Sequence, residues 1–379
     1  MTSQAVAPPA RLHKSKIQIK SVLWLRERFG WMGSHSGYDH LCQVMPSIQK
    51  SSHYITTERD PKKAPPQRYM RFLNWMARNV QASPFYGPAS TAAEVATLWE
   101  CLRQKPDVVH ITYIENHLGI LPDYKKRLSF NVVGTCHQPG SWWRLQHTHP
   151  ESISSLDALI VLSRREINYF QQFLGDRVHF IPHGIDTDFF HPATQEKQLN
   201  PRFIFSGSWL RDLQTLVQVV EQTLKQSPSI QFDMIVPRSK RQNEYFYRLG
   251  RYPQVSWHAG ISDEQLCQLY QQASGLVLPL IDCTANNALL EAISCGLPVI
   301  TNDIGGIPDY TDPGFATLLP PGDVDGFVDA ILELADSPAI RHNRGIAARQ
   351  FAVNNLDWSQ VVQQTFDLYQ TVSHEDCLY

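Results

Sequence analysis

The chain has 379 residues, of which 42% are hydrophobic and 18% charged, and its formal net charge is −2. This composition excludes an intrinsically disordered chain, and the length favours two domains over a single core. No apolar run reaches the roughly 18–20 residues that a bilayer-spanning helix needs. Residues 1–16 are polar, contain prolines and lack the apolar segment of a signal peptide, so we expect a flexible tail there.

The cysteines indicate the cellular compartment of the protein, and the charges indicate the kind of partner that it binds. Seven scattered cysteines with no CxxC spacing predict a reduced cytoplasmic protein without a structural metal. Residues 1–150 carry 19 Lys and Arg against 9 Asp and Glu, whereas residues 151–379 carry 15 against 27. Two explanations stay open: the halves attract each other across a cleft, or the basic half meets an anionic partner.

Short apolar segments alternate with helical segments through the first half. The spacing of these segments predicts parallel βαβ units in an amino-terminal domain of residues 17–192. The predicted strands are 17–25, 107–112, 130–135, 156–162 and 178–181, and the predicted helices are 38–48 and 164–173.

The second half repeats this rhythm after a polar, proline-bounded segment at 191–201. We predict a second domain at 200–356 and a terminal segment at 357–379. Two Rossmann-like α/β halves would bind ligands in the cleft between the carboxyl ends of their strands. The predicted strands are 203–206, 232–236, 255–258, 275–279 and 299–301, and the predicted helices are 212–225, 262–273, 323–335, 340–353 and 358–372.

Residues 67–80 read as a basic amphipathic helix. Tyr69, Phe72, Leu73, Met76 and Val80 recur at helical spacing, and arginines lie off that stripe. Such a helix can lie on an anionic membrane, although packing against a core is the commoner role. We therefore expect a protein that is cytoplasmic and a candidate for peripheral contact with the inner membrane face, with no nucleic acid as partner.

The segment 286–306, NNALLEAISCGLPVITNDIGG, is the strongest functional signal. It contains a helix start, one carboxylate (Glu291), a Gly-Leu-Pro turn, a short strand and the glycine pair Gly305 and Gly306. Amides at a helix start can hold phosphate oxygens, and a carboxylate in an apolar helix needs partners such as ribose hydroxyls. The alternative for Glu291 is a solvated helix glutamate.

Further donor-side candidates surround this segment. The turn after the strand 203–206 offers a close backbone approach to a phosphate and a guanidinium for a diphosphate, while Lys240 follows a later strand. The polar loop before Glu291 can present hydroxyls, amides and helix-start N–H groups, although an ordinary asparagine-rich turn has the same composition. The donor-side candidates are Gly207, Ser208, Arg211, Lys240, Asp282, Thr284, Asn286, Asn287 and Ala288.

The first half supplies the acceptor-side candidates. His137 ends a predicted strand and could hydrogen-bond a sugar hydroxyl or transfer a proton, although most histidines are structural. Glu115 lies just beyond another strand. A glycine-rich strand-to-helix turn allows a ligand close to the backbone, and it consists of Gly33, Ser34, His35, Ser36 and Gly37.

Three segments resemble the group 1 (family 4) retaining glycosyltransferases. ALLEAISCGLPVITNDIGGIPDY is similar to the family's donor-site signature, IPHGIDTDFF to its interdomain motif, and PDVVHIT with the strand ending at His137 to its acceptor-domain strands. The resemblance implies the two-domain GT-B fold, with a last helix that crosses back to the first domain. It also implies that Glu291 binds the donor ribose and that His137 lies near the transferred sugar. The glycine loop at 33–37 would lie near the donor phosphates and the acceptor, and the pair at 305–306 would form the donor-side glycine loop.

Two positions depart from the family pattern. Cys283 stands where the first Glu of the family's pair is expected, with Asp282 as the neighbouring carboxylate. The family's phosphate-site Gly-Arg followed by Lys is replaced by Gly207-Ser208, with Arg211 as the candidate cation. His137, Asp282 and Glu291 are the residues that we expect to carry the chemistry.

The leading functional hypothesis is transfer of a sugar from a nucleotide diphosphate sugar to a hydroxyl of a glycan, lipid or small molecule. The resemblance implies retention of anomeric configuration, no metal and no cofactor besides the sugar nucleotide as co-substrate. Two alternatives stay open: a sugar-nucleotide epimerase of the same architecture, and a non-catalytic homologue that binds sugar nucleotides or glycans.

Overall fold

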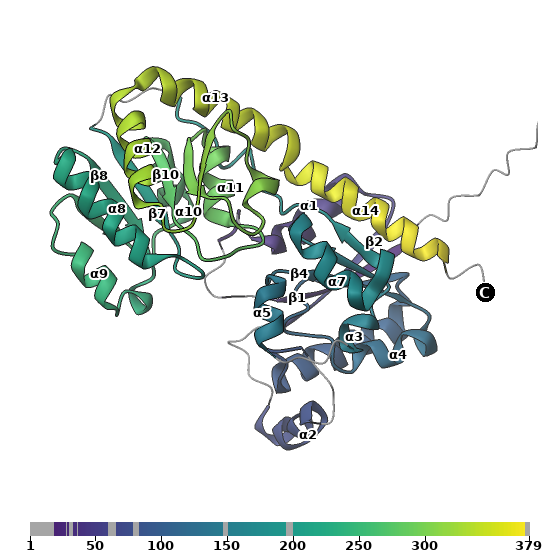
Figure 1. Ribbon diagram of the computed structural model, residues 1–379. Coiled ribbons are helices and arrows are strands. Elements are labelled where there is room, and N and C mark those ends of the chain that lie inside the picture. The colour runs from purple at the N-terminus through teal and green to yellow at the C-terminus, as the bar shows by residue number, and fades with distance from the viewer. Residues whose placement is uncertain are drawn as a thin grey trace, which may run out of the picture.

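Two parallel β-sheets, each covered by helices on both faces, form the two lobes of the protein (Figure 1). The computed structural model describes residues 19–27, 29, 33–35, 37–59, 66–78, 83–146, 151–194 and 200–375. The predicted tail at 1–16 lies outside the described residues. The predicted α/β architecture of two Rossmann-like units is confirmed.

The first sheet has the order β2-β1-β3-β4-β5-β6, and all its pairings are parallel. Four of the predicted strands match its members, and the strand predicted at 17–25 is shifted to Ser21–Glu27. The edge strand β2 was not predicted because its half-exposed sequence, HYITTER, has no apolar core. The strands are β1 Ser21–Glu27, β2 His53–Arg59, β3 Val108–Ile111, β4 Asn131–Cys136, β5 Ala158–Val161 and β6 Val178–Phe180.

Helices cover both faces of this sheet (Figure 1). The helices at 38–48 and 164–173 are confirmed, each beginning with a short 3₁₀ turn. The helices of this half are η1 Tyr38–His40, α1 Leu41–Ile48, α2 Gln67–Arg78, α3 Pro88–Gln104, α4 Leu121–Leu128, α5 Gly140–Leu145, α6 Glu151–Ser154, η2 Arg164–Glu166, α7 Ile167–Leu174 and η3 Gly175–Arg177.

The second sheet has the order β12-β11-β10-β7-β8-β9, again parallel throughout. Its strands are β7 Arg202–Ser206, β8 Gln231–Ile235, β9 Val255–His258, β10 Gly275–Leu278, β11 Val299–Asn302 and β12 Ala316–Leu319. Its helices are α8 Leu213–Gln226, η4 Arg238–Lys240, α9 Glu244–Leu249, α10 Asp263–Gln272, α11 Asn287–Ser294, η5 Ile307–Tyr310, α12 Val324–Asp336, α13 Pro338–Asn355 and α14 Trp358–Glu375. The predicted boundary at 191–201 falls between β6 and β7.

The side chains of β1 alternate between the two faces of the first sheet, and both faces are apolar. Val22 and Trp24 point into one core and Leu23 and Leu25 into the other. Buried parallel strands therefore read as continuous apolar runs, as the predicted strands of this chain do. The second lobe has one large core of its own.

The last helix, α14, leaves the second lobe and packs on the first, as the yellow ribbon of Figure 1 shows. Trp358, Phe366 and Tyr369 join the core that contains Val22 and Trp24. Beside the start of α14, the backbone of Ile185 donates to Leu356 O at 2.8 Å, so the two connections between the lobes lie side by side. The predicted crossing of the terminal helix is confirmed.

Gly184 lies in this crossover and packs against α14. It is absent from the positive-φ residues of the described chain. A Cβ on Gly184 would lie 2.4 Å from the Trp358 ring. The glycine is therefore required for close packing of α14.

Helix α2 confirms the predicted helix but corrects its faces. Leu73 is buried, whereas Tyr69 and Phe72, which were placed on the same apolar stripe, are exposed. Val80 lies outside the described residues. No helix in the described ranges combines the length and apolar composition that crossing a bilayer requires.

Candidate active site between the two lobes

Each sheet has one topological switch point, where neighbouring strands send their connections to opposite sides. In the second sheet this point lies between β7 and β10, and in the first between β1 and β3. Parallel α/β sheets bind ligands outside the carboxyl ends of the strands at such points. The loops that follow these four strands contain most of the residues predicted from the sequence.

The turn after β7 is shaped by one glycine and one arginine. Gly207 has a φ of 91°, and its missing side chain leaves room for Arg211, whose Nη2 would lie 2.6 Å from a Cβ. Arg211 donates to Ser206 O at 3.0 Å, to Trp209 O at 2.9 Å and to Asn286 Oδ1 at 3.3 Å. Burial lowers the pKa of Arg211 to about 10, so the guanidinium stays charged at neutral pH. Ser208 lies half-buried in the same turn.

Glu291 lies inside the second lobe and is only 4% exposed. It occupies the second turn of α11, where Tyr270 Oη donates to its Oε2 at 2.9 Å. Burial, followed by the charge of Glu291, raises the pKa of Tyr270 well above its ordinary value, so the phenol keeps its proton. The alternative of a solvated glutamate is therefore wrong for Glu291.

The start of α11 faces the turn after β7. Asn286 caps the helix by accepting from Leu289 N at 3.4 Å, and the same Oδ1 accepts from Arg211. Asn287 and Ala288 form the first turn, whose amides have no carbonyl partners within a helix. A guanidinium beside helix-start amides is an arrangement that binds anions.

The glycine pair at 305–306 packs directly on the loop before α11. A Cβ on Gly305 would lie 2.1 Å from Cys283 O, and one on Gly306 would lie 1.8 Å from Thr284 O. Gly306 N also donates to Cys283 O at 2.8 Å. Both glycines therefore permit two loops to touch, in addition to any contact with a ligand.

The same loop contacts the first lobe. Thr284 Oγ1 donates to the carbonyl of His137 at 2.7 Å, and Ser141 Oγ donates to Asp282 Oδ2 at 2.5 Å. Cys283 is buried, and burial raises the pKa of its thiol to about 12, so it stays a neutral group at this junction. Predicted donor-side and acceptor-side residues thus meet where the lobes touch.

His137 is held as a neutral imidazole. Its ring stacks on Tyr113 with a centroid separation of 3.8 Å, and its Nε2 lies 2.9 Å from Thr112 O. A carbonyl only accepts, so Nε2 carries the proton and Nδ1 is left as an acceptor. Burial, with His183 and His110 nearby, lowers the pKa of His137 well below 6.5. His137 can therefore accept a hydrogen bond from a hydroxyl, but it is a poor acid.

Glu115 positions the turn that carries His137. Its Oε1 accepts from His137 N at 2.5 Å, from Gln138 N at 2.7 Å and from Cys136 Sγ at 3.4 Å. Burial raises the pKa of Glu115 to about 6, and these hydrogen bonds oppose the rise. Glu115 therefore acts on the backbone of His137 in this structure.

The glycine loop of the first lobe contacts α10. Ser34 N donates to Asp263 Oδ2 at 2.6 Å, and a Cβ on Gly33 would lie 2.5 Å from Asp263 Oδ1. His35 Nδ1 lies 2.7 Å from Asp186 Oδ2. Gly37, with a φ of 107°, is the N-cap residue of η1, and Ser36 lies outside the described residues. A shallow hollow of about 330 Å³ is lined by Gly33, Ser34, His35, Ser262, Asp263 and Glu264.

Lys240 stands apart from these residues. It is exposed on η4 after β8, and in the described part of the chain its side chain makes no hydrogen bond or ion pair. Across the same ranges, no group of three His, Cys, Asp or Glu residues has the geometry to hold a metal ion.

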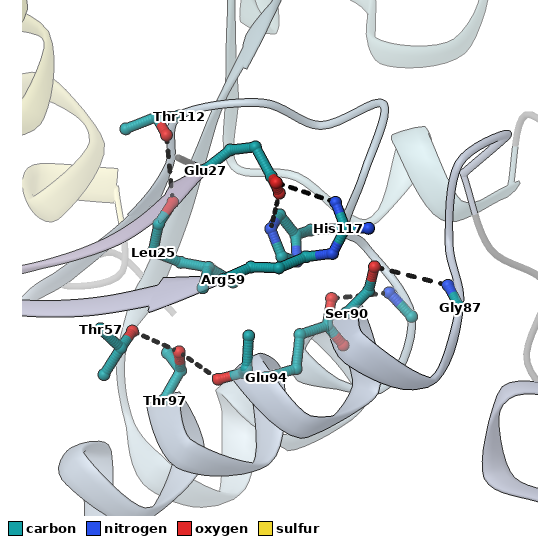
Figure 2. Close-up of polar contacts among 12 residues, drawn as sticks. Leu25, Glu27, Thr57, Arg59, Gly87, Ser90, Glu94, Thr97, Thr112 and His117 are labelled. Carbon is teal, nitrogen blue, oxygen red and sulfur yellow. Dashed lines mark hydrogen bonds and ion pairs between the residues drawn. The ribbon is translucent and has the colours of Figure 1, made fainter. Parts of the chain in front are cut away.

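Sequence reasoning missed a buried polar cluster at the switch point of the first sheet (Figure 2). Glu27, at the end of β1, lies between Arg59 Nη1 at 2.8 Å and His117 Nε2 at 3.3 Å, and both Glu27 and His117 are fully buried. Glu94 lies nearby on α3 and accepts from the amides of Gly119 and Ile120 at the start of α4. A charged residue ending an apolar strand was the available signal for Glu27.

Two family profiles match the chain, one on each lobe. Glycosyltransferase Family 4 matches residues 49–189, and Glycosyl transferases group 1 matches residues 200–337. The chain belongs to the group 1, family 4 glycosyltransferases. The predicted family and enzyme class are thereby confirmed.

Curated relatives of this glycosyltransferase are distant. It is 24% identical over 274 residues to the MMP alpha-(1->4)-mannosyltransferase of Mycolicibacterium hassiacum, covering 64% of this chain and 66% of that protein. It is 24% identical over 346 residues to the D-inositol 3-phosphate glycosyltransferase of Kribbella flavida, covering 78% of this chain and 81% of that protein.

Solved structures agree with this glycosyltransferase in fold. Sucrose-phosphate synthase from Thermosynechococcus elongatus superposes with a TM-score of 0.68 at 15% identity, covering 94% of this chain and 100% of that one. The Anabaena protein HepE in complex with UDP and glucose gives a TM-score of 0.67 at 13% identity, covering 93% and 100%. The predicted GT-B fold is confirmed.

Proposed function

We propose that this glycosyltransferase moves a sugar from a nucleotide diphosphate sugar to a hydroxyl acceptor, with retention at the anomeric carbon and without a metal. The contact between Thr284 and His137 carries the proposal, because it joins the switch-point loop of the second sheet to a strand end of the first. The complex of the Anabaena neighbour with UDP and glucose supports a sugar-nucleotide donor.

The donor would bind the second lobe. Arg211 and the amides at the start of α11 would face the diphosphate and stabilise the charge that develops on it as it leaves. Glu291, oriented by Tyr270, would accept hydrogen bonds from ribose hydroxyls. The predicted role of Gly207, Ser208, Gly305 and Gly306, which remains a proposal, is to let the donor approach the backbone closely.

The acceptor would bind the first lobe. In the reaction the bond from the anomeric carbon to the diphosphate breaks, and the diphosphate leaves with the electron pair. A new bond forms to the acceptor oxygen, and the proton that this oxygen loses passes to the leaving diphosphate. His137 would orient a sugar hydroxyl through Nδ1. Glu115 would position His137, and the glycine loop with Ser34, His35 and Ser36 would lie at the acceptor side.

A donor panel tests the proposal. Purified protein is incubated with uridine, guanosine and adenosine diphosphate sugars, with and without candidate acceptors, and free nucleoside diphosphate is measured. Acceptor-dependent release that persists in EDTA, with retained configuration in the product by NMR, is the expected result. Glu291→Gln should slow this release by roughly 10- to 100-fold, and the exposed Glu333→Gln should keep it.

The same panel separates the alternatives. Isomerised sugar nucleotide without an acceptor would indicate the epimerase. Calorimetric binding of a donor without turnover would indicate the non-catalytic homologue, for which the neutral Cys283 in place of the family's glutamate is the supporting feature. Absence of both binding and release with every donor would contradict all three.

A further inference from the structure

Helix α2 presents an outward face that is both aromatic and cationic. Tyr69, Phe72 and Trp75 are 48%, 57% and 62% exposed. Arg68 and Arg71 are also exposed. At 100° per residue, Arg68, Arg71, Phe72 and Trp75 fall on one side of the helix, opposite the buried Leu73. A solvent-facing helix surface normally carries polar residues, so this face is unusual for a soluble protein.

The side chains of this outward face are arranged in pairs. The rings of Phe72 and Trp75 stack with a centroid separation of 6.0 Å, and the guanidinium of Arg68 lies 4.7 Å from the Tyr69 ring centroid. No acidic residue occurs in Gln67–Arg78. Aromatic rings beside arginines match the interface of an anionic bilayer, where rings enter the headgroup layer and guanidiniums pair with phosphates.

The position of α2 leaves this face accessible. The helix packs through its inner face on α3 and projects from the first lobe, away from the second (Figure 1). Helix α3 presents a second exposed apolar row of Val95, Trp99 and Leu102 at positions i, i+4 and i+7. Exposed apolar surface that gathers on neighbouring helices indicates an interaction site.

The described basic residues of the first half make no ion pair across the junction between the lobes. Among the described residues, the ion pairs that join the lobes are Arg164–Asp309 and Arg165–Asp303. Both bases lie beyond residue 150, so the basic excess of residues 1–150 is not used in these contacts. This observation favours an anionic partner over mutual attraction of the lobes.

We infer that the outward face of α2 docks the protein on an anionic lipid surface. The docked helix follows β2 closely in the chain, because β2 ends at Arg59 and α2 begins at Gln67, and Arg59 pairs with Glu27 at the carboxyl end of β1. An acceptor carrying a lipid could then reach the first lobe from the membrane. Docking itself does not depend on the proposed sugar-transfer reaction.

Vesicle flotation tests the inference with the full chain. Vesicles of phosphatidylcholine with 30% phosphatidylglycerol should carry the protein upward at low salt, pure phosphatidylcholine vesicles should not, and added salt should release it. Arg68→Gln with Arg71→Gln should weaken binding roughly 30-fold, since each cation near such a surface contributes a factor of about five. Phe72→Ser with Trp75→Ser should weaken it about tenfold or more.

The matched control lies on the second lobe. Tyr247 is an exposed aromatic residue on α9, and Arg251 is an exposed arginine in the turn after α9. Tyr247→Ser with Arg251→Gln should leave flotation unchanged. Circular dichroism verifies that every variant is folded. No flotation on anionic vesicles, equal loss in the control, or binding of RNA without binding of vesicles would overturn the inference.

Discussion

At the scale of single residues, Tyr270 and Glu291 are the pair on which the proposed donor site depends. Tyr270 is fully buried and keeps its proton, and its hydroxyl fixes one oxygen of Glu291. A buried carboxylate held in this way has a defined direction before any ligand arrives. Orientation of this kind lowers the entropy cost of binding.

Substitutions of this pair should distinguish the residue that contacts the donor, Glu291, from the residue that orients it, Tyr270. We expect Glu291→Gln to reduce kcat/KM for the donor by roughly 10- to 100-fold, because a hydrogen bond to a charged group contributes about 1.5–3 kcal/mol. Tyr270→Phe should raise the KM for the donor with a smaller effect on kcat, because the carboxylate remains but loses its orientation. Equal, unchanged kinetics in both variants would contradict the assignment.

Glu115 makes stability depend on pH. Burial raises its pKa from the ordinary 4.5 to about 6, so folding favours the protonated form. Its contribution to stability is full below pH 4.5 and is lost as the pH rises through 6. The free energy of unfolding of the wild type, minus that of Glu115→Gln, should therefore fall by about 2 kcal/mol between pH 4.5 and 7. Urea titrations measure this difference, and a constant value contradicts the prediction.

Prediction of burial succeeded where a local pattern surrounds the residue. The buried position of Glu291 was expected because an apolar helix and a glycine turn enclose it, and its role in binding remains a proposal. Glu27 and His117 were missed because their pairing joins residues that are ninety positions apart and appears only when β1 and β3 lie side by side. Arg211 was identified as a cation, but its bonds to its own turn could not be read from sequence.

At the scale of elements, α11 links the second lobe to the junction between the lobes. Its cap, Asn286, both begins the helix and holds Arg211. Helix caps of this type contribute about 1 kcal/mol. The element therefore connects local helix stability to the placement of the candidate diphosphate-binding cation.

Two cap substitutions separate these effects. Asn286→Ala and Asp323→Ala each remove a side-chain cap, of α11 and α12 respectively, and each should lower stability by about 1 kcal/mol in thermal or urea unfolding. Only Asn286→Ala should also weaken donor binding, because Arg211 loses a partner. Equal donor affinity in the two variants would contradict the role of α11.

Element prediction depended on apolar content. The buried strands and the helices predicted at 262–273 and 323–335 agree with the structure to within a few residues. The edge strand β2 and the helix α3 were missed, because β2 is half-exposed and the buried face of α3 consists mainly of Ser, Thr and Ala. Both elements are defined by their neighbours more than by their own sequence.

At the scale of the whole molecule, two neighbouring segments join the lobes: the turn that contains Gly184 and the start of α14. Gly184 lies against Trp358 at the point where α14 returns to the first lobe. Gly184→Ala should therefore destabilise the protein by about 1–3 kcal/mol through overpacking. Gly87→Ala is the control, since a Cβ there meets no atom within 4 Å. Comparable melting temperatures for the two variants would contradict this reading.

The return of α14 has a practical consequence for dividing the protein. If the chain is cut between Thr194 and Asn200, the piece bearing α14 keeps an apolar helix whose binding surface belongs to the other piece. Two separately expressed fragments, 19–194 and 200–375, should recognise each other through that helix and reassemble. Helix α14 therefore suits the protein to split-fragment complementation. The first fragment alone would expose the surface that binds α14, and the second would expose the apolar face of α14, so neither should remain soluble alone.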